Sequence, residues 1–320
     1  MGVEYLLIAS LEDVVKRFDQ VQALDHVSFP IAEGEIVGLL GPNGAGKTTA
    51  IRALAGLISI DAGTIRLFGA VQDVNNIKLK KDLGLVTQEV TVFPELTAEE
   101  NLRYFGGLYG LRGDHLKQRV AKTLEFVGLS DYGRRLPRKY SGGMQRRLNI
   151  ACALVHEPRF LIMDEPTVGI DPQSRSYILD SVKKLAAKGT TVLYTSHYME
   201  EVEPIASRIV IMDQGRVIAD GTLAELISRL QHEETVRLTV VSPSVSLGDR
   251  LQAIQGVKSV VQNGSEYTIR STAGSGNLNR VLTVAQQNGG VSYISAEKPT
   301  LEDVFLTLTG KSLRDKEGQG

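Results

Sequence analysis

A glycine-rich segment near the start of the chain has the residue types that bind phosphate groups. It fits the pattern G-x-x-x-x-G-K-[ST], follows the apolar run Ile36–Leu40 and opens the helix-favouring stretch 48–57. Glycines let backbone N–H groups turn inward around an anion, and the positive end of the helix dipole strengthens the attraction. The segment consists of Gly41, Pro42, Asn43, Gly44, Ala45, Gly46, Lys47, Thr48 and Thr49.

Two side chains of this segment add specific chemistry. The Lys47 ammonium is expected to reach the β- and γ-phosphates of a nucleotide, and the Thr48 hydroxyl is expected to ligate Mg²⁺. The alternative is an ordinary glycine-rich turn before a buried helix. Nucleotide binding is favoured because further motifs of nucleotide hydrolysis follow along the chain.

Two carboxylates follow the apolar run Phe160–Met163, which is typical of a strand buried on both faces of a parallel sheet. Ligands of open α/β sheets bind at the carboxyl ends of such strands. Asp164 is therefore a candidate partner of Mg²⁺, and Glu165 a candidate to orient or deprotonate a water that attacks the γ-phosphate. The alternative for both is an acidic strand end in a solvated turn.

Together these motifs resemble the ATPase domain of an ABC transporter, over roughly residues 4–225. The resemblance rests on the glycine-rich loop, on Gln88 and on the Asp-Glu-Pro-Thr that begins at Asp164. It also rests on the later Gly-Ile-Asp that ends at Asp171 and on the Ser-His that ends at His197. The most specific element is the signature Ser141, Gly142 and Gly143. This resemblance implies a P-loop α/β fold with a mostly parallel sheet core, an antiparallel β subdomain and a helical subdomain, and ATP as the nucleotide.

The signature departs from the commonest Leu-Ser-Gly-Gly-Gln form at two positions, where Tyr140 and Met144 stand. The serine and both glycines are intact, so we expect activity to survive. The Ser-Gly-Gly-Met variant followed by Gln-Arg-Arg-Leu is similar to drug- and antibiotic-export members of the ABC-2 branch.

The resemblance also implies roles for four further residues. Phe18 stands where the family places an aromatic ring that stacks on adenine, although a core phenylalanine on a strand is the alternative. Gln88 would ligate Mg²⁺ and relay the nucleotide state to the helical subdomain. Asp171 belongs to a loop that crosses to a partner subunit. His197, after the strand Thr191–Ser196, would contact the γ-phosphate.

In this family the signature of one subunit closes over ATP held by the phosphate loop of another. The sequence contains one such loop and one signature. A complete site therefore requires a second ABC ATPase subunit. The resemblance implies a head-to-tail dimer with two buried ATP molecules, most simply a homodimer.

Composition sets further bounds. The net charge of −1 gives no electrostatic footprint for nucleic acid, so none is expected as a partner. The one cysteine, Cys152, lies in an apolar helical stretch and is interpreted as a small buried hydrophobe in a reducing compartment. We find no signal peptide and no apolar run of about 18 residues. The transport path would belong to a separate ABC-2-type permease, holding this chain at the cytoplasmic face of the membrane.

The domain organisation follows the motifs. We expect an ATPase domain over residues 1–230, with a helical subdomain at about 88–155 in which one helix begins at the N-cap Thr97. In the family this subdomain carries the groove that receives a permease's coupling helix. The apolar residues expected beside it are Val92, Phe93, Pro94 and Leu96, and simple packing inside the subdomain is the alternative.

The last ninety residues show a different pattern. Strands are predicted at 235–241, 257–261, 266–270 and 291–296, with helices at 247–254, 278–287 and 301–308 and a hairpin turn at Asn263-Gly264. The order βαββαβ indicates a small α+β ferredoxin-like accessory domain over 231–310. Its ending is similar to the tail of bacterial drug-export ATPases. Residues 311–320 are polar and are expected to be disordered.

Two functions from different classes stay open at this point. The first is an ATP-hydrolysing subunit that energises a separate permease, exporting a drug, antibiotic or other small molecule. The second is a soluble ABC ATPase that acts on ribosomes or DNA. Such translation-type members usually carry two ATPase domains and the DNA-repair members insert long coiled coils, neither of which is present. A GTPase is disfavoured because the guanine-reading Asn-Lys-x-Asp is missing.

Overall fold

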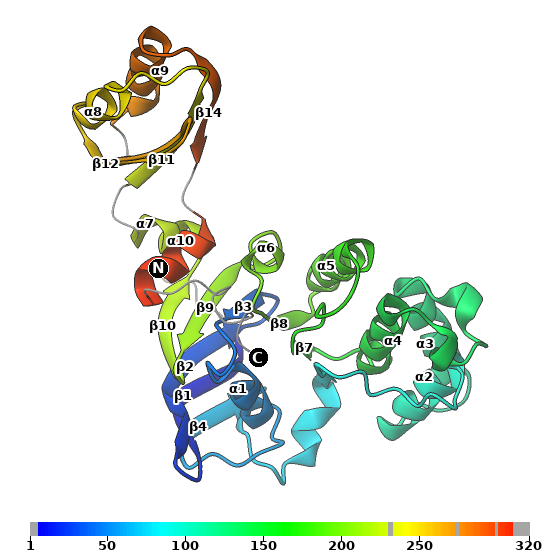
Figure 1. Ribbon diagram of the computed structural model, residues 1–320. Coiled ribbons are helices and arrows are strands. Elements are labelled where there is room, and N and C mark those ends of the chain that lie inside the picture. Colours follow the sequence, from blue (N-terminus) through cyan, green and yellow to red (C-terminus); the bar gives the residue numbers. More distant parts are fainter. Residues whose placement is uncertain (1–5, 230–232, 273–274, 298–299, 310–320) are drawn as a thin grey trace. The chain divides into compact units, whose positions relative to one another are not determined.

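The computed structural model describes residues 6–229, 233–272, 275–297 and 300–309, so the predicted tail at 311–320 lies outside the described residues. The chain divides into two compact units, Met1–Leu223 and Ala224–Gly320. Each unit is built around its own sheet or sheets (Figure 1). None of the helices in the described part of the chain combines the length and the apolar character needed to cross a membrane.

A six-stranded sheet forms the centre of the first unit, in the order β10-β9-β3-β8-β7-β6. All neighbouring strands run parallel except the antiparallel pair β9 and β10, which confirms the predicted mostly parallel core. The strands are β3 (Ile36–Leu40), β6 (Leu83–Val86), β7 (Phe160–Met163), β8 (Thr191–Ser196), β9 (Arg208–Asp213) and β10 (Arg216–Gly221).

Three adjacent strands of this sheet, β3, β8 and β7, position the candidate site residues. Every residue of β3, β7 and β8 is buried, as expected for strands of a parallel sheet that is covered on both faces. Because the strands are parallel, their carboxyl ends meet at one edge of the sheet. The glycine-rich loop, the Asp164–Glu165 pair and His197 all follow these ends directly.

A second, antiparallel sheet has the order β2-β1-β4-β5. Its strands are β1 (Leu7–Phe18), β2 (Val21–Ala32), β4 (Ala62–Leu67) and β5 (Ala70–Val71). One apolar core joins this sheet to helix α1 (Lys47–Leu54) and to the six-stranded sheet. The helix is thereby held between two sheets, which fixes the loop that precedes it (Figure 1).

The remaining elements of the first unit are helical. Helices α2 (Ala98–Leu108), α3 (Gly113–Phe126) and α4 (Gly142–Leu154) surround a separate core that contains Leu102, Leu124 and Leu148. Thr97 is the N-cap of α2, as predicted, and it forms a reciprocal capping box with Glu100. The other helices are α5 (Pro172–Ala186), α6 (Met199–Val202) and the short 3₁₀ turns η1 (Ile77–Asp82), η2 (Ser130–Tyr132) and η3 (Pro137–Lys139).

The second unit has the predicted βαββαβ order, with a helix before and after it. Its sheet has the order β12-β13-β11-β14 and is antiparallel throughout, which is the ferredoxin-like arrangement. The elements are α7 (Leu223–Arg229), β11 (Glu233–Val240), α8 (Leu247–Gln252), β12 (Val257–Asn263), β13 (Glu266–Thr272), α9 (Asn277–Gln287), β14 (Val291–Glu297) and α10 (Leu301–Thr309).

The hairpin between β12 and β13 differs from the prediction by one residue. Asn263 still pairs with Glu266, so the two-residue turn is Gly264-Ser265 and not Asn263-Gly264. Gly264 adopts a φ of +60°, which glycine tolerates without a steric cost. The turn therefore uses the glycine in its first central position.

Candidate active site

The glycine-rich loop connects β3 to α1 and needs glycine for steric reasons. Gly46 has a φ of +99°, and a Cβ there would lie 2.6 Å from the Ala23 carbonyl oxygen. At Gly41 a Cβ would lie 2.3 Å from the carbonyl oxygen of Met212. Gly46 is the N-cap of α1 and supplies no side-chain cap, so the first N–H groups of the helix are left for an anion.

The Lys47 side chain lies against the backbone at the start of this loop. Its side chain is 4% exposed, and its ammonium donates to the carbonyl oxygens of Gly41 and Pro42 at 2.8 and 3.2 Å. The Glu165 carboxylate lies 3.3 Å from the same nitrogen. Burial lowers the pKa of the Lys47 ammonium, and the Glu165 charge opposes that shift.

Asp164 lies beside Thr48 at the end of β7. Its Oδ1 accepts hydrogen bonds from the hydroxyls of Thr195 at 2.9 Å and of Thr48 at 3.4 Å. Burial raises the pKa of the Asp164 carboxyl. The structure thus brings together a hydroxyl and a carboxylate that the sequence places 116 residues apart.

Glu165 is held from several sides. Its backbone has a φ of +45° and its N–H donates to the Thr195 hydroxyl at 2.9 Å. One carboxylate oxygen accepts from Gln88 at 3.3 Å and lies 3.5 Å from His197 Nδ1. Interaction with His197 holds the pKa of this carboxyl below its ordinary value, and Lys47 adds to the effect against the cost of burial. Glu165 is therefore an ionised acceptor at neutral pH, suited to act on a water.

The donor set fits the Mg²⁺ that the family implies. A hydroxyl, a carboxylate and the side-chain amide of Gln88 are oxygen ligands of the kind that Mg²⁺ uses alongside substrate phosphates and water. Over residues 6–229, 233–272, 275–297 and 300–309, no group of three His, Cys, Asp or Glu side chains is arranged to hold a metal ion. One carboxylate, Asp164, beside a hydroxyl and an amide is consistent with an ion that is shared with phosphates.

Glu201 is a buried residue of this region that sequence reasoning missed. Its side chain is 1% exposed, and one oxygen accepts hydrogen bonds from Thr167, Ser196 and Tyr194 at 2.6, 2.9 and 3.1 Å. Its other oxygen forms an ion pair with Arg175 at 3.1 Å. The carboxylate thereby joins α6 to the loop after Glu165, to β8 and to α5. Its position four residues after His197 is the only sequence signal.

The Gln88 segment is tied to the signature helix. Arg146, which lies on α4 and is 5% exposed, donates to the carbonyl oxygens of Thr87 and Gln88 at 2.9 and 2.6 Å. The guanidinium thus fixes the backbone on both sides of the Gln88 amide. Arg146 thereby links α4 to a residue that contacts Glu165.

The signature residues lie at the start of α4, where Ser141 is the N-cap and accepts from the Met144 N–H at 3.3 Å. Ser141 and Gly142 are exposed, and a Cβ on Gly142 would meet nothing within 4 Å. Gly143 differs, since a Cβ there would lie 2.0 Å from the Ser174 hydroxyl. The first two residues are open to a partner, while Gly143 is required for packing against α5.

Three further predicted positions have clear local settings. Asp171 is the N-cap of α5 and accepts from the Ser174 N–H at 2.9 Å, a structural role that the sequence interpretation did not include. Phe18 is 46% exposed at the end of β1, which excludes the alternative of a core phenylalanine. Tyr140 is buried and its hydroxyl donates to the Tyr132 carbonyl oxygen at 2.7 Å, so this departure from the common signature is accommodated.

Comparison with known proteins agrees with this geometry. Residues 24–168 match the ABC transporter family model, and residues 221–309 match the C-terminal domain of ATP-binding proteins like DrrA1-3. The linearmycin resistance ATP-binding protein LnrL of Bacillus subtilis is 42% identical over 95% of this chain and 99% of its own length. The daunorubicin resistance ATP-binding protein DrrA3 of Streptomyces coeruleorubidus is 37% identical over 96% and 98%.

Further relatives extend the comparison. The Nod factor export ATP-binding protein I of Cupriavidus metallidurans is 36% identical over 96% of this chain and 99% of its own. An ATP-binding subunit of an ABC transporter superposes with a TM-score of 0.64 at 30% identity, covering 70% of this chain and 93% of that one. The dimeric cassette MJ0796 bound to ADP and Pi superposes with a TM-score of 0.61 at 27% identity, covering 67% and 98%.

The fold and site therefore define an ATP-hydrolysing P-loop protein with a signature segment. The chain belongs to the ABC transporter family, as an ATP-binding subunit that couples ATP hydrolysis to transport.

Proposed function

We propose that this chain energises a separate ABC-2-type permease that exports a drug, an antibiotic or another small molecule. The names of its relatives support this reading, since they include two antibiotic-resistance ATP-binding proteins and a Nod factor exporter subunit. The second unit matches the C-terminal domain of ATP-binding proteins like DrrA1-3, which favours the drug-export branch of the family. These relatives favour transport over an action on ribosomes or DNA.

The chemistry we assign to the site follows from its contacts. Lys47 and the N–H groups of the glycine-rich loop would bind the phosphates of ATP, and Thr48, Gln88 and Asp164 would hold Mg²⁺. When bound, Mg²⁺ supplies charge neutralisation on the phosphate oxygens. Glu165 accepts a proton from, or orients, the attacking water. The observation that carries this assignment is the position of the Glu165 carboxylate, 3.3 Å from the Lys47 ammonium and 3.5 Å from His197 Nδ1.

His197 and Phe18 are assigned contacts with the two ends of the nucleotide. His197 Nδ1 lies 3.5 Å from Glu165 and has no hydrogen-bond partner among the described residues, which suits a contact with the γ-phosphate. Phe18 exposes its ring beside Lys16, whose ammonium is 5.3 Å from the ring centroid. An exposed aromatic face near a cation is suited to stack on adenine.

We further propose that two copies of the chain form a head-to-tail homodimer with ATP shared between them. The open Ser141 and Gly142 at the start of α4 would close on the phosphates held by the partner, and Asp171 would lie at the same junction. A dimeric relative supports the arrangement.

A surface on the helical part suits the permease. The loop before α2 is fixed by Asn101, which is fully buried and bonds the Phe93 backbone at 2.8 and 3.0 Å. The Phe93 ring stays 41% exposed and packs edge-on against Tyr104, 5.0 Å between centroids. Val92 and Leu96 are half-buried, whereas Pro94 is exposed. We assign this apolar surface to a permease helix, which would hold the chain at the cytoplasmic face of the membrane.

We assign one role to each of two domains. Residues 1–230 would be the ATPase domain with its helical subdomain at about 88–155, and residues 231–310 an accessory interaction domain. The ferredoxin-like unit has its own core, which includes Val236, Leu251 and Ile269.

The proposal is tested in cells. A strain lacking the gene should become hypersensitive to at least one compound in a toxin panel, and the unmutated gene should restore resistance. Glu165→Gln should fail to restore it although the protein accumulates to the same level. Restoration by Glu165→Gln would show that ATP hydrolysis at this site does not drive the export.

A further inference from the structure

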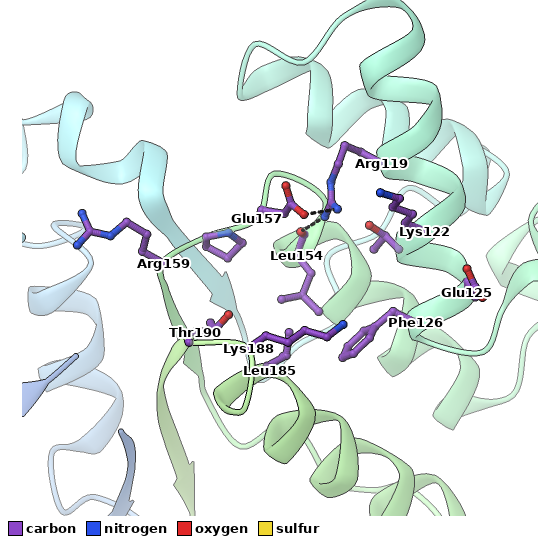
Figure 2. Close-up of a pocket in the computed structure, with 13 residues that line it drawn as sticks. Arg119, Lys122, Glu125, Phe126, Leu154, Glu157, Arg159, Leu185, Lys188 and Thr190 are labelled. Atoms are coloured by element: carbon purple, nitrogen blue, oxygen red, sulfur yellow. Dashed lines mark hydrogen bonds and ion pairs between the residues drawn. The ribbon is translucent and has the colours of Figure 1, made fainter. Parts of the chain in front are cut away.

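The first unit contains a hollow that lies apart from the candidate nucleotide site. It has a volume of about 730 Å³ and is lined by α3, by the loop that leads into β7 and by the loop that leads into β8 (Figure 2). The lining includes Arg159, directly before β7, and Thr190, directly before β8. The cavity thus lies at the amino ends of the two strands whose carboxyl ends carry Glu165 and His197.

The lining combines an apolar floor with charged side chains. Phe126, Leu154, Pro158 and Leu185 supply the apolar surface. Cavities of about 300–1,000 Å³ with mainly apolar walls and a few polar groups are the usual sites of small ligands.

The two arginines of the lining are already neutralised. Arg119 pairs with Glu157 and also donates to the Val155 carbonyl oxygen at 3.1 Å. Arg159 pairs with Glu33 at 2.7 Å, and Figure 2 shows it pointing away from the other lining side chains. Neither guanidinium is therefore left to bind an anion.

The two lysines are different. Among the residues that the structure describes, Lys122 and Lys188 form no ion pair, and the Lys188 ammonium lies 5.4 Å from the centroid of the Phe126 ring. One exposed carboxylate, Glu125, also lines the cavity. The ammonium groups of Lys122 and Lys188 thus face one unpaired carboxylate, that of Glu125. One positive charge is therefore left uncompensated beside the apolar part of the lining.

We propose that this cavity binds a small amphipathic monoanion, an aromatic or aliphatic body with one carboxylate-like head. The apolar body would lie on Phe126, Leu154 and Leu185, and the head between Lys122 and Lys188. Because the ligand would contact both the helical part and the starts of β7 and β8, its binding changes the rate of ATP turnover. This second statement rests on the proposed function, whereas binding does not.

Binding is tested first, on the full chain without nucleotide, using 2-naphthoate as the probe. We expect saturable binding with a dissociation constant on the order of 100 µM and shifts in the methyl NMR signals of Leu154 and Leu185. The neutral 2-naphthamide and inorganic phosphate should each bind at least about tenfold more weakly, because each lacks one half of the recognition.

A matched pair of variants locates the site. Lys122→Glu with Lys188→Glu should weaken 2-naphthoate binding about tenfold or more. Lys117→Glu with Lys183→Glu makes the same charge change on the same two helical regions, at exposed positions outside the lining, and should bind normally. Equal losses in both pairs, no saturation below millimolar probe, or equal binding of the amide would overturn the proposal.

Turnover is measured second. Saturating 2-naphthoate should change kcat of the unmutated protein at least about twofold with little change in KM for ATP, and should leave the Lys122→Glu/Lys188→Glu protein unaffected. Bound probe with unchanged turnover would overturn the regulatory statement alone. No turnover in any sample would count against the proposed ATPase function and leave the binding result standing.

Discussion

The Lys47 ammonium lies 3.3 Å from the Glu165 carboxylate. The lysine that we assign to the phosphates of ATP is therefore in contact with the carboxylate that we assign to the attacking water. Both side chains are at least nine-tenths buried. Each therefore lowers the cost of burying the other's charge, and neither can be removed without leaving the other charge buried. Substitutions of Glu165 and of Lys47 should therefore differ in their effect on ATP binding, because only Lys47 is assigned to the phosphates.

For Glu165→Gln we expect ATP affinity within a few-fold of the unmutated protein and turnover reduced by at least about 100-fold. The amide keeps the volume of the side chain but cannot accept a proton. Dimers should accumulate with ATP because hydrolysis no longer separates them. Phosphate release and size-exclusion chromatography measure the two effects, and turnover within a few-fold of normal would remove Glu165 from the catalytic role.

For Lys47→Ala both ATP affinity and turnover should fall, because a charge-assisted contact to the phosphates is lost and Glu165 loses its lysine partner. Equilibrium binding of a fluorescent ATP analogue checks the affinity. If affinity stayed unchanged while turnover vanished, Lys47 would act only in the transition state.

Glu201→Gln should reduce kcat about tenfold with little change in ATP affinity. The amide cannot match the negative charge opposite Arg175 or accept three hydroxyls on one oxygen, so the loop after Glu165 and the strand before His197 lose their common anchor. Ser196→Ala and Thr167→Val each remove one contact and should give smaller losses of the same kind. A pure stability loss, with kcat normal below the melting temperature, would argue against positioning.

Stability should fall as the pH drops from 7 towards 4, partly because of His156. Burial lowers the pKa of this imidazole to about 4, and its Nε2–H donates to the Leu83 carbonyl oxygen at 3.1 Å. Its Nδ1 is buried and has no hydrogen-bond partner within the described part of the chain. The unfolded chain binds a proton near pH 6.5 and the folded chain near pH 4, so the unfolded state gains protons first. The stabilising contribution is full above the unfolded pKa and is lost between about 6.5 and 4.

The check is a pair of melting curves. His156→Gln should show a smaller fall in Tm between pH 7 and pH 5 than the unmutated protein, although its stacking on Tyr109 is lost. His115→Gln, at an exposed position on α3, is the control and should follow the unmutated protein. Parallel curves for all three would show that His156 does not carry this pH dependence.

Particular residues show how far the sequence alone could reach. The bounds of β3 and β7 were predictable because continuous apolar runs between turn residues form buried parallel strands. Thr97 was predictable because a capping box is a local interaction. The hairpin at Gly264 was off by one residue because the cross-strand register, set by packing, decides which pair forms the turn.

The parts that sequence reasoning missed depend on distant contacts. Glu201 looks like one acid among several on a short helix, and only the fold places three hydroxyls and Arg175 around it. Gly143 was grouped with the phosphate-facing residues, yet its glycine requirement comes from Ser174 on another helix. Neither contact leaves a periodic or motif-like trace in the chain.

The shared-site arrangement is the central claim, and mixing two inactive proteins tests it most directly. Ser141→Arg places bulk and charge at the open start of α4 and leaves its own phosphate loop intact, so this protein should be a monomer that binds ATP but barely hydrolyses it. Mixed with Lys47→Ala, it forms one site from an intact phosphate loop and an intact signature. The account predicts that hydrolysis returns in the mixture, to at most about half of normal. Normal hydrolysis by monomeric Ser141→Arg protein alone would contradict it.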